Sequence, residues 1–380
     1  MTMLRVPEKI IGGHHIEGQA ADAIKKLGHS KIMLVTGPHV GKSDLFARYK
    51  SAIEAAGVEC VVFDRITGEP TDSMIRSGAE VYKTCDCEAV MGIGGGSPLD
   101  AAKLIAAYSR MGEGLFAGKP LPDNIGDIAA LPTTTGTGSE ATKFACVTLE
   151  ADGVKLLVKG DAMIPRIAVL DYDASLGMPS SVKAATAFDA LTHAIEAYLS
   201  HRATPVTDDL AVSAVRRIYT SLAASIDNPA DTAASRNLAV AAFEAGVCIN
   251  NSSVTVVHGM SRPIGALFHI SHGLSNAMLL TTCLRDLAAT AADRLAILGR
   301  DAGIIAASED ASAMIDRIDA LRRRCNIPLL SRSGIDADRF EASLAKMAAD
   351  AIASGSPANA PKDYTAADLI TLYRKAWVAQ

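Results

Sequence analysis

Four side chains in the second half of the chain are of types that bind transition metals. Asp189 and His193 are four positions apart, so on a helix they stand on one face about one turn apart. His258 and His272 follow much later, each directly before a glycine. One carboxylate and three imidazoles suit Fe(II) or Zn(II) and leave room for a substrate oxygen. An Asp–His pair alone is also typical of a helix surface, and a single histidine is also typical of a protein core. The prediction of a metal site therefore depends on the combination of all four residues.

A glycine-rich run at residues 92–100 is a candidate phosphate-binding loop. Its sequence, Gly-Ile-Gly-Gly-Gly-Ser-Pro-Leu-Asp, follows an apolar segment and precedes a helical one. Glycines let backbone N–H groups approach a pyrophosphate, and the start of the following helix favours negative charge. We expect Ser97 to be the N-cap, Pro98 to lie in the first turn and Asp100 to complete a capping box. A tight, capped turn without a ligand is the alternative, because the run is not a clean GxGxxG.

A second polar loop, Pro-Thr-Thr-Thr-Gly-Thr-Gly-Ser-Glu at residues 132–140, also follows an apolar segment. Its threonine hydroxyls and flexible glycines are suited to line a cofactor groove, although an ordinary polar turn has the same composition. Ligands of open α/β sheets bind at the carboxyl ends of the strands. Two such loops, each after a strand, therefore predict a dinucleotide groove better than either does alone.

The order of predicted elements indicates two domains. In the first half, short apolar runs alternate with helical stretches, which is typical of a parallel, doubly wound sheet. Strands are expected at 31–36, 59–64, 89–93, 128–131 and 166–171, and helices at 40–56, 72–83 and 97–110. Alanine-rich helices without strands follow at 182–200, 207–225, 233–248, 275–287, 290–302, 311–325 and 337–353, then a loop at 355–362 and a last short helix. We therefore expect an α/β domain at 1–177 and an all-helical domain at 178–380.

The length and composition limit the kinds of binding partner and the cellular compartment that we expect. A chain of 380 residues is longer than a domain with a single hydrophobic core usually is. Its net charge of −5 gives no indication of a nucleic-acid or anionic membrane partner. Residues 1–11 contain no apolar signal-peptide core, and no stretch of about 18 residues is free of both charged and polar groups, so neither a signal peptide nor a membrane span is expected. The seven scattered cysteines suggest reduced thiols, and hence a cytoplasmic protein.

Four blocks of the sequence together resemble the iron-dependent alcohol dehydrogenase family, which includes lactaldehyde reductases, propanediol dehydrogenases and butanol dehydrogenases. They occur in the order of the family and span nearly the whole chain. The blocks are Gly94-Gly-Gly-Ser-x-x-Asp100, Pro132-Thr-Thr-x-Gly-Thr-x-x-Glu140, Lys183-Ala-Ala-Thr-x-x-Asp189-Ala-Leu-Thr-His193-Ala-Ile-Glu196 and His258-Gly-Met with His272-Gly-Leu-x-Asn276.

The resemblance implies a Rossmann-like N-terminal domain, a helical C-terminal domain and a cleft between them, the dehydroquinate synthase-like architecture. It implies hydride transfer between NAD or NADP and a small alcohol, aldehyde or hydroxy acid, with the metal lowering the pKa of the alcohol. A homodimer is common in the family. The residues implied as metal ligands are Asp189, His193, His258 and His272. Those implied at the cofactor are Gly94, Gly95, Gly96, Ser97, Asp100, Thr133, Thr134, Thr137 and Lys155.

Two departures from the family pattern concern the adenosine end of the cofactor. Members that prefer NAD usually carry an aspartate after the strand at 31–36, where this chain has Gly37. That acid accepts a ribose hydroxyl and repels a 2′-phosphate, so its absence leaves both NAD and NADP open. Glu69 stands where many members carry asparagine, and it returns an acidic group to the same region.

A third departure concerns the proton relay. Many members carry another histidine four residues after the third metal ligand, where this chain has Arg262. A guanidinium binds carboxylates in two-point fashion, so Arg262 suggests a substrate with an anionic group, with an internal ion pair as the alternative. His269 is a candidate replacement relay, or else an ordinary surface or core histidine. The competing functions are a zinc-dependent glycerol dehydrogenase-like or dehydroquinate synthase-like enzyme, and a nucleotide-binding protein without activity.

Overall fold

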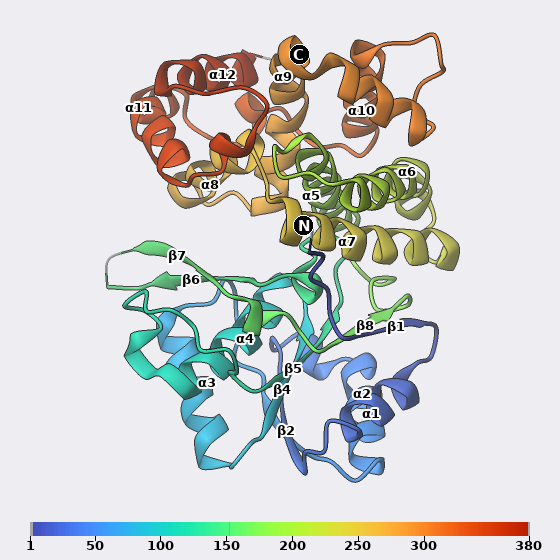
Figure 1. Ribbon diagram of the computed structural model, residues 1–380, viewed down its shortest axis with the longest axis vertical. Coiled ribbons are helices and arrows are strands. Elements are labelled where there is room, and N and C mark those ends of the chain that lie inside the picture. The colour runs from blue at the N-terminus through green and yellow to red at the C-terminus, as the bar shows by residue number, and fades with distance from the viewer. Residues whose placement is uncertain (1–2, 152, 379–380) are drawn as a thin grey trace. The chain divides into compact units, whose positions relative to one another are not determined.

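The computed structural model describes residues 3–151 and 153–378, and it divides into two compact units (Figure 1). The α/β unit comprises Arg5–Thr134 and Gly138–Leu176. The helical unit comprises Gly177–Gln380, together with Thr135–Thr137 and the first residues up to Leu4. The short segment Thr135–Thr137 belongs to the helical unit although it lies within the sequence of the other unit.

A six-stranded parallel sheet forms the centre of the α/β unit, in the order β1-β8-β5-β4-β2-β3. The two most central strands, β4 and β5, are apolar along nearly their whole length, as expected for strands covered on both faces. The strands are β1 (Lys9–Gly13), β2 (Lys31–Val35), β3 (Glu59–Phe63), β4 (Ala89–Gly94), β5 (Asp127–Pro132) and β8 (Ile167–Asp171).

Helices cover both faces of this sheet, because successive side chains of each strand point to opposite sides. On β2, Ile32 and Leu34 pack with α1 (Glu17–Lys25) and α2 (Asp44–Ala55). Met33 and Val35 belong to the core on the other face, with α3 (Asp72–Thr84) and α4 (Gly96–Met111). The predicted doubly wound α/β class is therefore confirmed.

Four elements of the α/β unit, β1, α1, β6 and β7, were not expected from the sequence. The edge strand β1 and helix α1 are short; β1 has only exposed and half-buried positions, and α1 buries one side. An antiparallel hairpin joins β6 (Phe144–Leu149) and β7 (Val154–Lys159) outside the main sheet. Each strand has only six residues; β6 alternates half-buried with buried positions at its start, and β7 is mostly exposed, so the signal in the sequence is weak.

The helical unit has one continuous core built largely of alanine, leucine and isoleucine. No strand occurs among its described residues. Small alanines allow helices to pack closely, and α5 is buried along almost its whole length. The helices are α5 (Ser180–Leu199), α6 (Pro205–Asp227), α7 (Thr232–Ser252), α8 (Val256–Phe268), α9 (His272–Asp301), α10 (Ala311–Arg324), α11 (Ala337–Ala353) and α12 (Ala366–Val378).

Two features of this unit differ from expectation. Helix α8 was not predicted, because Pro263 and two glycines interrupt its helical pattern, yet proline is accommodated inside it. The two helices expected at 275–287 and 290–302 form the single element α9, with non-helical backbone only at Ala291. No disulfide forms among the seven cysteines. Within the described ranges no single helix is long and apolar enough to cross a membrane, and α7 with α8 meets that criterion only as a pair bent by 105°.

Candidate active site

The first two residues of the candidate metal site lie on the buried helix α5. Asp189 and His193 are one turn apart, and both side chains are almost fully buried. The Asp189 Oδ1 atom is 3.8 Å from His193 Nε2. The helix presents both groups toward the same point, as the i, i+4 spacing predicts.

Helices α8 and α9 bring the other two histidines to the same carboxylate. His258 Nε2 and His272 Nε2 are each 3.8 Å from Asp189 Oδ1. One donor atom from each of the four residues lies within 4.8 Å of the others. Ligands with bonds of about 2.1 Å on opposite sides of one ion are about 4.2 Å apart, so the 3.8 Å spacing fits donors that share an ion.

A glycine next to His272 permits this arrangement. A Cβ atom on Gly273 would lie 2.6 Å from the carbonyl oxygen of Ala185 and 3.2 Å from the Cβ of Asp189. The first turn of α9 therefore contacts the α5 backbone more closely than any side chain would allow. This contact places His272, the first residue of α9, beside Asp189.

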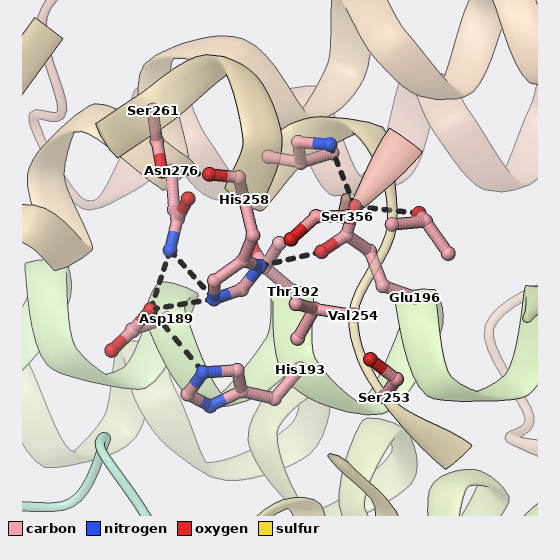
Figure 2. Close-up of polar contacts among 12 residues, drawn as sticks. Asp189, Thr192, His193, Glu196, Ser253, Val254, His258, Ser261, Asn276 and Ser356 are labelled. Carbon is pink, nitrogen blue, oxygen red and sulfur yellow. Dashed lines mark hydrogen bonds and ion pairs between the residues drawn. The ribbon is translucent and has the colours of Figure 1, made fainter. Parts of the chain in front are cut away.

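The polar groups around Asn276 fit a cation at this point (Figure 2). Its Nδ2 lies 2.7 Å from Asp189 Oδ1, 3.1 Å from His258 Nε2 and 3.3 Å from His272 Nε2. An amide nitrogen has only two hydrogens, so it cannot satisfy three lone pairs. The carboxylate and the three imidazoles therefore have lone pairs that the amide cannot satisfy, and a divalent cation would bind them.

The directions of the pKa shifts at Asp189 and His258 are consistent with a bound cation. Burial raises the pKa of Asp189, but the three imidazoles and the Asn276 amide outweigh it, so the pKa of Asp189 lies below its usual value. Burial, assisted by the neighbouring histidines, lowers the pKa of His258 well below its usual value. The groups therefore favour an ionised carboxylate and, at His258, a neutral imidazole, which are the metal-binding forms.

A buried carboxylate behind His258 was not identified as a site residue from the sequence. Glu196 is fully buried on α5, one turn beyond His193. It accepts hydrogen bonds from the Thr255 hydroxyl, from the Val257 N–H and from His258 Nδ1. Figure 2 shows His258 between Glu196 on one side and Asp189 on the other. A carboxylate on Nδ1 leaves Nε2 as the ligating nitrogen, an arrangement common at metal sites.

Arg262 and His269 occupy different positions on α8. Arg262 lies one turn after His258, is half-buried, and donates from a guanidinium nitrogen to the Ser356 hydroxyl at 3.0 Å. His269 ends α8 as its C-cap, with a left-handed backbone and an exposed side chain. The structure does not include His269 among the four clustered ligands.

Helix α4 begins two residues earlier in the glycine loop than the sequence suggested. The N-cap is Gly95 and the helix starts at Gly96, so the expected cap at Ser97 is wrong. Gly94 ends β4 with φ of +152°, a backbone conformation that favours glycine. A Cβ on Gly92 would lie 2.9 Å from the Cα of Leu99, so α4 packs directly against its strand.

The threonine loop lies beside the glycine loop at the carboxyl ends of β4 and β5. The Thr133 N–H donates to the carbonyl oxygen of Gly94 at 2.8 Å. A Cβ on Gly95 would contact the Thr134 methyl group at 3.3 Å. The hydroxyls of Thr134 and Thr135 are buried without a hydrogen-bond partner in the protein, as expected of groups that await a ligand or water. Thr137, the third predicted cofactor threonine, lies in the segment assigned to the helical unit.

Three further predicted cofactor residues have other contacts in the structure. Asp100 does not complete a capping box, because its carboxylate accepts from the Ser139 hydroxyl and the Cys146 N–H. Lys155, on β7, donates to Glu69 at 2.8 Å. Gly37 follows β2, and a Cβ there would lie 2.7 Å from the carbonyl oxygen of Ile66.

Two family models match consecutive parts of the chain. The model described as iron-containing alcohol dehydrogenase matches residues 7–172, and that of the C-terminal part of the Fe-containing alcohol dehydrogenase family matches residues 183–377. Together they cover both units.

Similar proteins extend this match over the full length. The lactaldehyde reductase of Escherichia coli K12 is 31% identical over 378 residues, covering 96% of this chain and 97% of the relative. The 1,3-propanediol dehydrogenase of Citrobacter freundii is 31% identical over 381 residues, covering 98% of each.

Solved structures show the same architecture. A crystal structure of a 1,3-propanediol oxidoreductase has a TM-score of 0.95 at 28% identity and covers 99% of this chain and 100% of its own. The sulfoacetaldehyde reductase of Bifidobacterium kashiwanohense, in complex with NAD⁺, has a TM-score of 0.90 at 25% identity and covers 100% of both chains.

Proposed function

Because the chain belongs to the iron-containing alcohol dehydrogenase family and is a metal-dependent alcohol dehydrogenase or aldehyde reductase, we propose that it exchanges hydride between a small alcohol or aldehyde and NAD or NADP. The alternatives, a zinc-dependent glycerol dehydrogenase-like or dehydroquinate synthase-like enzyme and an inactive nucleotide-binding protein, lack the family match found over both units. The single observation that carries the proposal is the convergence of Asp189, His193, His258 and His272.

The helical unit supplies the ligands. Asp189, His193, His258 and His272 would hold a divalent cation, which when bound supplies Lewis acidity toward the oxygen of the alcohol or aldehyde. Glu196 holds the ring of His258, and Gly273 allows His272 to approach Asp189. We propose Fe(II) as the native metal, with Zn(II) as a competitor that such ligands bind more tightly.

The α/β unit supplies the candidate cofactor loops. Backbone groups of Gly94, Gly95 and Gly96 at the start of α4 suit a pyrophosphate, and the neighbouring Thr134 hydroxyl has no protein partner. Gly37 leaves no acid after β2 to repel a 2′-phosphate, so both NAD and NADP are proposed as substrates. The sulfoacetaldehyde reductase structure, which contains NAD⁺, supports nicotinamide as the cofactor class.

Arg262 suggests the class of alcohol or aldehyde. It projects from α8 one turn beyond the ligand His258, and its positive charge contributes to the lowered pKa of that histidine. A guanidinium one turn from a metal ligand favours alcohols or aldehydes that also carry a carboxylate or sulfonate. The similar sulfoacetaldehyde reductase is named for an aldehyde of this charge. We further propose a cytoplasmic homodimer, in keeping with the expectations from composition and family.

An anaerobic assay tests the proposal. Protein reconstituted with Fe(II), and in parallel with Zn(II), is mixed with NADH or NADPH and a panel of neutral and anionic aldehydes, and absorbance at 340 nm is followed. Metal-dependent oxidation of the cofactor, absent in Asp189→Asn, is the expected result. A protein that retains its metal yet oxidises neither cofactor with any aldehyde would contradict hydride transfer.

A further inference from the structure

Two charged residues on α4, the buried Lys103 and the half-buried Asp100, bind residues 139–146, which begin at the end of the threonine loop. Lys103 is completely buried. Its ammonium group donates to the Thr142 carbonyl at 2.9 Å, to the Thr142 hydroxyl at 3.2 Å and to the Phe144 carbonyl at 2.9 Å. All three hydrogens of the ammonium are therefore used inside the α/β unit.

Asp100 lies one turn before Lys103 and binds the same segment at two other points. Its Oδ1 accepts from the Ser139 hydroxyl at 2.6 Å, and its Oδ2 accepts from the Cys146 N–H at 2.9 Å. Each carboxylate oxygen therefore has a partner in this segment. Asp100 and Lys103 together contact residues 139–146 through five hydrogen bonds.

These bonds connect the two candidate cofactor loops. The glycine loop runs into α4, and the last two residues of the threonine loop, Ser139 and Glu140, are the first two of the segment 139–146. A shift of α4 relative to this segment would change the spacing between the two loops. The Thr133 N–H bond to Gly94 fixes the loops only where they start, at the ends of their strands.

The charge of Asp100 and Lys103 indicates that they fix the position of the bound segment rather than add to the stability of the fold. Removing charges from water is costly, and well-packed apolar residues often stabilise a core as well as or better than a buried ion pair. Charged groups with several hydrogen bonds instead fix direction and distance, because each bond tolerates little displacement. Glu140, also buried, is a second carboxyl group near Lys103.

We propose that Asp100 and Lys103 are positioning residues that set the spacing of the glycine and threonine loops for a dinucleotide, without contacting it themselves. This inference rests on the proposed nicotinamide-dependent function. It replaces the expectation that Asp100 binds the cofactor directly.

The test measures cofactor binding directly. NADH and NADPH fluorescence titrations give Kd for the wild type, Asp100→Asn, Lys103→Met and the milder Ser139→Ala, with thermal unfolding and metal content recorded for each. Asp100→Asn is expected to weaken binding about tenfold, the cost of one hydrogen bond to a charged group, with KM for cofactor rising more than KM for aldehyde. Ser109→Ala is the matched control, because its hydroxyl bonds only within α4, to the Ile105 carbonyl.

Each outcome has a distinct meaning. Wild-type protein that binds neither NADH nor NADPH contradicts the proposed function itself. Wild-type binding with an unchanged Kd in folded Asp100→Asn and Ser139→Ala overturns the positioning role. The positioning role is also overturned if these variants change only in metal content or only in KM for aldehyde. If Asp100→Asn and Lys103→Met fail to fold, Ser139→Ala alone decides, and a Kd equal to that of Ser109→Ala rejects the inference.

Discussion

The carboxylate of Glu196 receives the Nδ1 hydrogen of His258, and the opposite nitrogen of that ring lies 3.8 Å from Asp189. One ligand is thereby oriented by a group that would not touch the metal. The Thr255 hydroxyl and the Val257 N–H, which bind the same carboxylate, extend this support to the start of α8.

Glu196→Gln is expected to weaken metal binding about 10- to 100-fold, the usual effect of removing such a partner. If the new amide NH₂ faces His258, the ring must accept at Nδ1 and carry its hydrogen at the ligating nitrogen. If the NH₂ faces the other way, it meets the Val257 N–H. Competition with a chromophoric chelator measures the affinity. Unchanged affinity would show that Glu196 only fills space.

His272→Ala is expected to abolish metal retention and to lower turnover on the order of a thousandfold, because Lewis acidity contributes several kcal/mol to such reactions. The fold should remain, since this side chain is partly exposed at the start of α9. Metal analysis, circular dichroism and the 340 nm assay measure these three properties. Normal turnover by metal-free variant protein would refute the assigned ligand set.

Gly273→Ala is expected to reduce both stability and metal affinity. The added methyl would lie 2.6 Å from the Ala185 carbonyl oxygen, so α9 must move away from α5 and take His272 with it. Overpacking of this kind costs about 1–3 kcal/mol. The control is Gly177→Ala, where a Cβ meets nothing within 4 Å. Equal melting temperatures and metal affinities in the two variants would contradict the prediction.

Arg262→Ala is expected to raise KM for a carboxylate-bearing aldehyde at least about tenfold, as a charged hydrogen bond is lost, while a neutral aldehyde of equal length is nearly unaffected. Arg262→Lys keeps the charge but not the two-point geometry and should be intermediate. Steady-state kinetics of both substrates give the comparison. An equal loss for the two aldehydes would mean that Arg262 supports α8 through Ser356 rather than selecting substrate.

Glu140→Gln is expected to stabilise the protein above neutral pH. Burial raises the pKa of Glu140 to about 7 from 4.5, and its own backbone N–H and the charge of Lys103 only partly offset this. Between these values the folded protein holds a proton that the unfolded chain releases, so stability falls as pH rises through this window. The gain from glutamine should reach at most about 3 kcal/mol above pH 7 and vanish below pH 4.5. Denaturant titrations at pH 4.5 and 8 measure the difference, and a gain independent of pH would contradict it.

The sequence was sufficient for the fold class because the main strands and helices have strong periodicity. The strand at 89–93 and the helix starting near 97 appear almost where they were expected. Helix α8 was missed because local propensity argues against Pro263, while packing in the helical core outweighs it. The β6–β7 hairpin was missed because its strands are short and half-exposed.

The candidate site was only partly accessible from the sequence. The spacing of Asp189 and His193 follows from helix geometry, but nothing local relates them to His258, and only the family resemblance supplied that link. The structure brings these residues together. Glu196 and Gly273 lie inside the resembling blocks or beside a ligand, yet their roles depend on contacts between helices. The same holds for Asp100, whose partners lie far along the chain.

The four candidate ligands come from α5, α8 and α9, and α6 and α7 lie between the first pair and the others in the sequence. A cation held by all four would therefore cross-link helices that are distant along the chain. Binding to the folded form alone adds about 2.7 kcal/mol when free metal is a hundredfold above Kd. Supply of the metal would then govern how long each molecule survives proteolysis as well as how fast it works, and starvation for the metal would deplete the enzyme itself.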